Sequence, residues 1–110
     1  MSNLAERKFR DRVQPKLDKI PNSWWESISQ KSVRGTPDVI GVINGTFIAL
    51  EFKSDDGIVA PIQQFKINKI IKAGGAACVL RPSNWDEAYE KLLHLGECKH
   101  DHTDVQISKQ

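Results

Sequence analysis

Cysteine is scarce in this chain, and long apolar runs are missing from it. Cys78 and Cys98 are too few for a disulfide framework. No apolar stretch approaches the roughly 18 residues that a membrane-spanning helix needs, and residues 1–20 are charged, without the apolar core of a signal peptide. We therefore expect a cytoplasmic protein with both thiols reduced and no membrane contact.

Several catalytic signatures are also missing. The chain has no P-loop, no dinucleotide-binding fingerprint and no Ser/His/Asp set for nucleophilic catalysis. We therefore expect no organic cofactor. Internal repeats are absent too, and 110 residues suit one domain. We assign residues 1–96 to that domain and the polar, aperiodic residues 97–110 to a flexible tail.

Charged residues are plentiful but unevenly placed. Residues 1–34 carry eight Lys/Arg against four Asp/Glu, whereas residues 35–110 carry eight against ten. A basic first third beside an acidic centre fits a polyanion held by one part and processed by another, although a solvated helix face explains the same excess. Basic side chains of this kind position a nucleic acid without reading its sequence. The candidates are Arg7, Lys8, Arg10, Arg12, Lys31 and Arg34.

Hydrophobic periodicity and turn residues predict seven secondary-structure elements. The first is a helix capped by Asn3, whose apolar side chains recur as far as Ile20, with a kink or a break at Pro15. Strands are expected at 24–29, 38–43, 46–53 and 77–81, with helices at 61–73 and from 84 to a stop at Gly96. The order α-β-β-β-α-β-α, with a parallel last strand, predicts an α/β fold in which helices flank a mixed central sheet.

Asn44-Gly45 sets the register of the central hairpin. This pair between alternating apolar residues favours a two-residue type I′ turn. Counting outward from the turn places Asp38 opposite Glu51, and directly opposed residues have Cβ atoms roughly 4.5–5.5 Å apart. Lys53, two residues beyond Glu51, points to the same face. Both faces of the hairpin are otherwise apolar, so we expect both to be covered.

Two carboxylates brought together on an apolar face need a counter-charge. Asp38 and Glu51 would hold Mg²⁺ or Mn²⁺ together with the backbone carbonyl of Phe52 and waters, because hard cations prefer oxygen ligands. Such a cation lowers the pKa of a bound water and stabilises charge that develops on a phosphodiester. Lys53 would position that water, shift its proton equilibrium or neutralise transition-state charge. The alternative is a purely structural role, with an exposed Glu51–Lys53 ion pair on an edge strand and Asp38 capping a turn.

The same residues carry a resemblance to a known family. Residues 35–38 read Gly-Thr-Pro-Asp and residues 51–54 read Glu-Phe-Lys-Ser, which resembles the motif of the PD-(D/E)XK nuclease superfamily. A short Asp/Gly loop, Gln63 early in a helix and Gly74-Gly75 before the last strand are similar to the VRR-NUC (virus-type replication-repair nuclease) branch. The resemblance covers residues 6–81. The chain departs from it at 59–61, which read Val-Ala-Pro where a Ser or Thr commonly caps the helix.

The resemblance implies a restriction-endonuclease-like αβββαβ core and a divalent metal. It implies that Asp38 is the motif acid, Glu51 the second acid and Lys53 the motif lysine. It also implies that Gln63 is the helix glutamine and Glu6 the first-helix glutamate. Small stand-alone members resemble Holliday-junction resolvases and tend to be homodimers, and many are viral. The implied setting is the cytoplasm of a bacterial or phage-infected cell.

Helical-wheel geometry bears on the two helix residues. Glu6 falls within about a quarter turn of the apolar stripe of its helix and so faces the protein, although it would also serve as the capping-box partner of Asn3. Gln63 lies on an apolar side of its helix, where a glutamine needs hydrogen-bond partners. A surface glutamine at a helix start is the alternative. Ile62 and Phe65 form a second apolar side, which favours contact with another subunit.

The expected function is therefore that of a Mg²⁺-dependent endodeoxyribonuclease. We expect it to hydrolyse branched DNA as a homodimer, in the manner of a Holliday-junction resolvase and in a DNA-repair setting. A site-specific homing or restriction-type endonuclease on duplex DNA is one alternative, since a dimer reads a palindrome. A DNA-binding module that does not cut is another, and the intact Asp38, Glu51 and Lys53 set argues against it.

Overall fold

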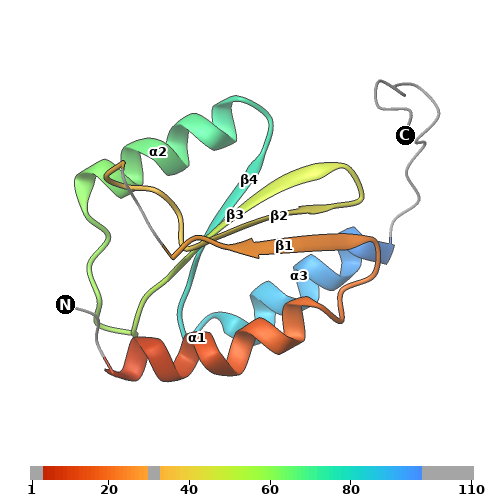
Figure 1. Cartoon of the computed structure of the whole chain (residues 1–110), viewed down its shortest axis with the longest axis horizontal. Coiled ribbons are helices and arrows are strands. Elements are labelled where there is room, and N and C mark those ends of the chain that lie inside the picture. Colours follow the sequence, from red (N-terminus) through yellow and green to blue (C-terminus); the bar gives the residue numbers. More distant parts are fainter. Residues whose placement is uncertain (1–3, 30–32, 98–110) are drawn as a thin grey trace.

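A four-stranded mixed sheet with helices on both sides forms the body of the protein (Figure 1). The computed structural model describes residues 4–29 and 33–97. The predicted element order and the α/β class are confirmed. In chain order the elements are α1 (Leu4–Leu17), β1 (Ser23–Ser27), β2 (Val39–Ile43), β3 (Thr46–Phe52), α2 (Pro61–Lys72), β4 (Ala76–Leu80) and α3 (Trp85–Glu97).

The central hairpin has the register that its turn predicts. Asn44 and Gly45 have positive φ values of 49° and 85°, as a type I′ turn requires. The antiparallel ladder runs from Ile43↔Thr46 to Val39↔Leu50. β4 lies on the other side of β3 and pairs with it in parallel, as predicted. One residue beyond the β2–β3 ladder, this register sets Asp38 against Glu51.

The lower face of the sheet in Figure 1 carries the core, which α1 and α3 cover. Phe52 of β3 packs edge-on against Phe9 of α1, with ring centroids 5.8 Å apart, and Phe9 packs in the same way against Trp85 of α3. Each fully buried side chain of this size contributes roughly 1.5–3 kcal/mol of hydrophobic free energy. The hairpin side chains buried on this face are Val39, Ile43, Ile48, Leu50 and Phe52.

The opposite face is covered only in part. α2 packs along β4 on this side (Figure 1). Trp24, Val42 and Phe47 form one cross-strand row over β1, β2 and β3, and their exposed fractions are 56%, 36% and 41%. The prediction that helices lie on both sides is confirmed, but the prediction that both faces are covered holds only for the part of the sheet beneath α2.

The sequence predicted a kink or a break at Pro15, and the break does not occur; the predicted helix stop at Gly96 is wrong. α1 continues through Pro15 to Leu17, because the burial of Val13 and Leu17 on either side of the proline outweighs one lost backbone hydrogen bond. Gly96 lies inside α3 and does not end it. A Cβ at Gly96 would come within 2.5 Å of the carbonyl oxygen of Pro21, so this glycine allows the backbone ahead of β1 to approach the helix closely.

Some predictions fall outside the described residues. These are Lys31, the helix cap at Asn3 and the tail, of which only Glu97 is described, as the last residue of α3. Within 4–29 and 33–97, no helix has the length and apolar character needed to cross a lipid bilayer.

Candidate active site

The predicted acidic residues gather at one end of the sheet, where α1 and α2 both begin (left in Figure 1). Asp38 directly precedes β2, and Glu51 is the next-to-last residue of β3. Glu6 lies in the first turn of α1, and Gln63 is the third residue of α2. Four segments that are distant in sequence therefore contribute side chains to this end.

Asp38 joins the ends of three strands. Its backbone N–H donates to the carbonyl of Leu50 at 3.1 Å, and its carbonyl accepts the N–H of Ile28 at 2.8 Å. Its side-chain Oδ2 accepts the backbone N–H of Phe52 at 2.8 Å. Standard bond lengths then place that oxygen at most about 5.7 Å from the Cα atom of Glu51. Asp38 is 9% exposed, and the hydrogen bond to Phe52 ties its carboxylate to β3.

Glu51 contacts two polar side chains, one from α2 and one from the residue just after β3. Its Oε2 accepts a 2.6 Å hydrogen bond from Nε2 of Gln63 and lies 3.8 Å from Nζ of Lys53. Glu51 is only 6% exposed, and β3 lies between β2 and β4. The structural alternative, an exposed ion pair on an edge strand, is therefore wrong for Glu51 and Lys53.

Gln63 is held by both ends of its amide group. Its Oε1 accepts the backbone N–H of Ala60 at 2.9 Å, while its Nε2 donates to Glu51. The glutamine thus satisfies a backbone donor at the start of α2, where the chain lacks the usual Ser or Thr. Because the carbonyl oxygen is occupied by Ala60, the NH₂ group is directed at Glu51. Gln63 is neither an isolated surface residue nor only a helix cap.

Arg10 links Glu6 to Asp38. Its Nη2 lies 3.7 Å from Oε2 of Glu6 and 3.9 Å from Oδ1 of Asp38. The side chain of Glu6 is 18% exposed, which agrees with the prediction that it faces the protein. The guanidinium also lies over the Phe52 ring, 5.8 Å from its centroid. Asp38 therefore contacts Arg10 of α1 and the backbone amide of Phe52, and Glu51 contacts Gln63 of α2.

The donor set suits a hard divalent cation with few protein ligands. Nowhere in the described part of the chain do three or more His, Cys, Asp or Glu side chains gather as a metal-binding group. Asp38 and Glu51 offer two buried carboxylates, and Phe52, the last residue of β3, adds a backbone carbonyl. Mg²⁺ commonly binds through one or two carboxylates and keeps several waters. These residues fit that mode and do not form an all-protein cage.

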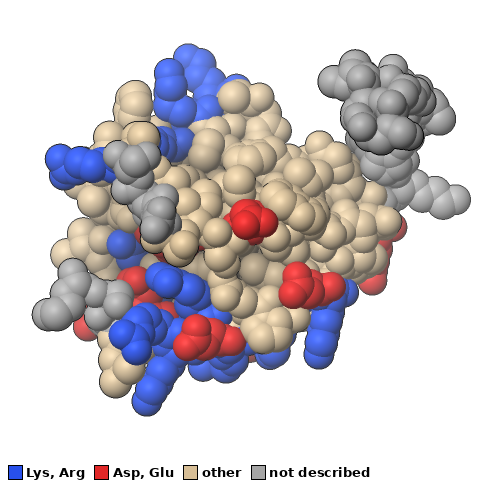
Figure 2. Space-filling view, viewed as in Figure 1, with Lys and Arg blue, Asp and Glu red and all other residues tan. Residues whose placement is uncertain are grey.

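The predicted basic residues separate into two groups. Arg10 lies beside Glu6 and Asp38, which together with Glu51 we call the acidic cluster, and its side chain is 31% exposed. Arg7, Lys8 and Arg12 are exposed on α1, and Arg34 is exposed in the loop ahead of Asp38. Lysine and arginine side chains gather along the lower edge of Figure 2, over α1, with carboxylates among them. The same arrangement suits a nucleic-acid contact or a solvated helix face.

Arg81 is a residue that the sequence did not single out. Its Nη1 donates to the carbonyls of Ser54 and Gly57, both at 2.7 Å, and lies 3.3 Å from that of Asp55. These carbonyls belong to the loop that follows Lys53, so Arg81 fixes the exit of β3. Its only sequence signal is its place just after β4, the strand that pairs in parallel with β3.

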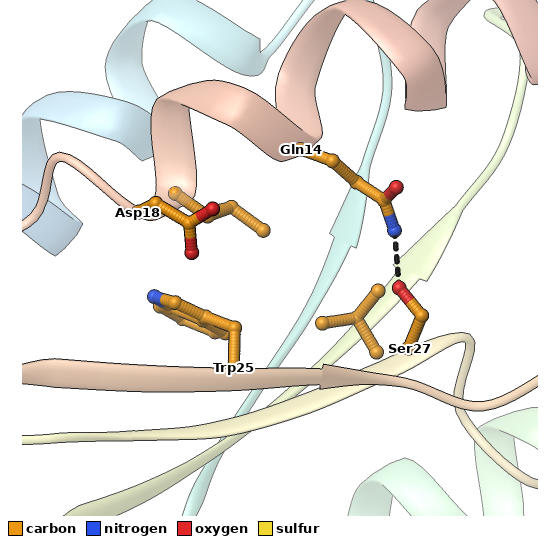
Figure 3. A pocket seen from close by; sticks show the side chains of 6 residues that line it. Gln14, Asp18, Trp25 and Ser27 are labelled. Carbon is orange, nitrogen blue, oxygen red and sulfur yellow. Dashed lines mark hydrogen bonds between the residues drawn. The ribbon is translucent and has the colours of Figure 1, made fainter.

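A separate crevice of about 140 Å³ lies between α1 and β1 (Figure 3). Gln14, one turn beyond Arg10, donates to the hydroxyl of Ser27 at 2.5 Å. Asp18 lies above the ring of Trp25 in the same view. The crevice is next to the acidic cluster but shares no side chain with it, and its hydrogen bond joins α1 to the edge strand.

Comparison with known proteins identifies no relative: no family model matches the chain, and neither a curated protein nor a solved structure is similar to it. The function proposed below therefore depends on the residues and their geometry.

Proposed function

We propose that the protein is a divalent-metal-dependent DNA endonuclease with a restriction-endonuclease-like core of the PD-(D/E)XK, VRR-NUC type. One observation carries this proposal. The buried carboxylate of Glu51 receives both the Gln63 amide and the Lys53 ammonium, and Asp38 bonds the amide of the next residue in β3. A purely structural strand end has no need of two buried acids, because replacing them with apolar residues avoids the desolvation penalty.

Asp38, Glu51 and the carbonyl of Phe52 are the groups that would hold Mg²⁺ or Mn²⁺. When bound, the cation supplies an activated water and stabilises negative charge on the phosphate. Asp38 is oriented by its hydrogen bond to the Phe52 amide, and Glu51 by Gln63. Both acids are thus preorganised, so little side-chain entropy is lost when they coordinate the ion.

Lys53 is the group best placed to act on the phosphate. Its Nζ lies 3.8 Å from Glu51, and its side chain is 16% exposed. An ammonium at this position neutralises charge that develops in the transition state and orients a water beside the carboxylates. Glu51 fixes the ammonium, and Gln63 in turn fixes Glu51.

The proposed substrate is DNA, with branched DNA preferred. The exposed cations Arg7, Lys8, Arg12 and Arg34 would contact phosphates on either side of the site. A homodimer would present two sites to the two strands of a junction, as twofold symmetry requires. The exposed apolar side chains of α2, Phe65 and Ile71, support such a dimer.

A cleavage panel tests this function. We expect the protein to cut a four-way junction with Mg²⁺ or Mn²⁺ in preference to a duplex of the same sequence, and to stop when a chelator is added. Flap and single-stranded substrates complete the panel. Failure to cut any of the four substrates with either metal contradicts the proposal, and cleavage of one duplex site alone favours a homing or restriction-type enzyme.

Two matched variants connect cleavage to the geometry. Gln63→Glu keeps an acceptor for the Ala60 N–H but places a second carboxylate against Glu51. We therefore expect its cleavage rate to fall at least tenfold, which corresponds to about 1.4 kcal/mol of activation free energy. Gln64→Glu, an exposed neighbour on the same helix, is the control and should cut like the wild type. Wild-type rates for both Gln63→Glu and Lys53→Ala would exclude this mechanism.

A further inference from the structure

Arg10 occupies an unusual position for a surface-helix arginine. Its guanidinium stands between Glu6 and Asp38, with contacts of 3.7 Å and 3.9 Å. Below it lies the ring of Phe52, whose backbone N–H donates to the same Asp38. A cation therefore already stands against one of the two proposed metal ligands.

The guanidinium is held there by charge more than by hydrogen bonds. Well-formed arginine–carboxylate pairs have N···O distances of about 2.7–2.9 Å and are often bidentate, and both contacts of Arg10 are clearly longer. Its Nε is buried and has no hydrogen-bond partner among the described residues. A buried donor without a partner carries an unrecovered desolvation penalty. The arrangement therefore provides a positive charge without a fixed geometry, which makes it easy to rearrange.

We propose that Arg10 is a built-in counter-ion that competes with the divalent cation for the acidic cluster. In the metal-free protein its guanidinium offsets the charge of Glu6 and Asp38, and binding of the cation weakens that contact by charge repulsion. The inference depends on the proposed metal site. Arg10 is a positioning residue in this account, because it acts through Asp38, and it differs in this respect from the exposed arginines of α1.

Competition with Arg10 predicts the direction in which the metal affinity changes when the arginine is removed. Two cations beside the same carboxylate repel each other, and a repulsion of about 1.4 kcal/mol corresponds to a tenfold change in a dissociation constant. Replacement of Arg10 by a neutral residue should therefore tighten metal binding about tenfold. A residue that merely supports the site would have the opposite effect, since its loss would loosen the acids.

Calorimetric titration with Mn²⁺ in the absence of DNA tests the inference. We expect Arg10→Gln to bind Mn²⁺ about tenfold more tightly than the wild type, and Arg10→Lys, which keeps the charge, to stay within about twofold of it. Arg7→Gln makes the same change in net charge at an exposed position of α1 and should leave the affinity unchanged. In chelator, Arg10→Gln should also melt at a lower temperature than the wild type, and the difference should shrink when Mn²⁺ is added.

Equal or weaker Mn²⁺ binding by Arg10→Gln overturns the inference, and so does an equal gain for Arg7→Gln. If Arg10→Gln does not fold, Arg10→Lys and Arg10→Met are compared instead, and equal affinities overturn it as well. Asp38→Asn and Glu51→Gln separate this outcome from failure of the proposed function. If both bind Mn²⁺ like the wild type, the metal site itself is wrong; if both lose it while Arg10→Gln gains nothing, only the counter-ion role is wrong.

Discussion

At the scale of single residues, Asp38 makes a structural hydrogen bond and, in the proposed function, also has a chemical role. One carboxylate oxygen accepts the hydrogen bond of the Phe52 amide at the end of β3, and the other lies 3.9 Å from Arg10. The two roles require different properties. The hydrogen bond needs only an acceptor, whereas pairing with a cation needs the negative charge. Substitutions that remove one property at a time therefore separate the fold from the chemistry.

We expect Asp38→Asn to fold with nearly wild-type stability and to lose metal-dependent cleavage. The asparagine carbonyl still accepts the Phe52 N–H, but the ligand charge is gone. Asp38→Ala leaves that buried amide without a partner, so it should lose about 1–3 kcal/mol of unfolding free energy as well. Denaturant unfolding and cleavage assays on both variants check this. Full activity of Asp38→Asn, or equal stability of the two variants, would contradict the assigned roles.

The residues that the sequence identified are those whose placement depends on local rules. Asp38, Glu51 and Lys53 follow from one turn and a two-residue period, so counting from Asn44 was sufficient. Arg10 was predicted only as a phosphate contact, because its approach to Asp38 depends on how α1 docks on the sheet. The side chain of Asn44 reaches the carbonyls of Leu95 and Gly96, 51 and 52 residues away. No local pattern encodes partners at such separations.

At the scale of elements, hydrogen bonds join the hairpin turn to the end of α3. Asn44 and Asn22 donate side-chain hydrogen bonds to the carbonyl of Gly96, at 2.9 Å and 3.0 Å. The backbone at Pro21 lies so near Gly96 that no Cβ fits between them. The sequence predicted a helix stop here because Gly commonly ends helices, yet the glycine is required for close packing. Distant backbone contact therefore overrode the local signal.

Gly96→Ala should destabilise the protein by about 1–3 kcal/mol, the range for overpacked sites. The clash with the Pro21 carbonyl outweighs the roughly 1 kcal/mol that alanine gains over glycine in a helix. His94→Ala, at an exposed position of the same helix, gains propensity without a clash and should be neutral or slightly stabilising. Urea denaturation measures both, and a stabilised Gly96→Ala would show that the close approach is not limiting.

The loop after β3 is also hydrogen-bonded to the turn between β4 and α3, through Asp55. The backbone N–H of Ser83 donates to Oδ1 of Asp55 at 2.9 Å. Hydrogen bonds from the side chain and backbone of Ser83 lower the pKa of Asp55 below its ordinary value of 3.8. Because the folded state prefers the ionised form, this contact stabilises the protein above about pH 3.8 and is lost as the pH falls through the lowered folded pKa.

We therefore expect Asp55→Ala to be less stable than the wild type at pH 6, and the difference to shrink as the pH falls below 3.8. Guanidinium denaturation at pH 6, 5, 4 and 3 measures the trend, with Asp11→Ala as the control at an exposed position of α1. A difference that stays constant or grows on acidification would contradict the role of the charged form.

At the scale of the whole molecule, the apolar surface is asymmetric. The side of the sheet that faces α1 and α3 carries the buried core, whereas α2 leaves the row of Trp24, Val42 and Phe47 partly exposed on the other side. None of the residues of α2 is buried among the described part of the chain, and Phe65 and Ile71 are 56% and 53% exposed. Ile62, predicted to share this outer side, packs near Gly35 of the loop between β1 and β2. Contact with a second copy remains our expectation for the rest.

Sedimentation at micromolar concentration should show that the wild type is a dimer and that Phe65→Glu is a monomer. The Phe65→Glu monomer should still be folded, with a melting temperature similar to that of the wild type. Leu4→Glu removes an equally exposed apolar side chain at the start of α1 and should leave the dimer intact. A wild type that sediments as a monomer, or a Leu4→Glu variant that dissociates as readily as Phe65→Glu, would contradict a dimer interface on α2.

The most direct measurement is the anomalous diffraction of crystals grown with Mn²⁺. The account predicts one strong peak at the sheet end, within coordinating distance of carboxylate oxygens from both Asp38 and Glu51. A peak that touches only one of the two acids, or Mn²⁺ bound elsewhere while this end of the sheet keeps Arg10 against Asp38, would contradict it.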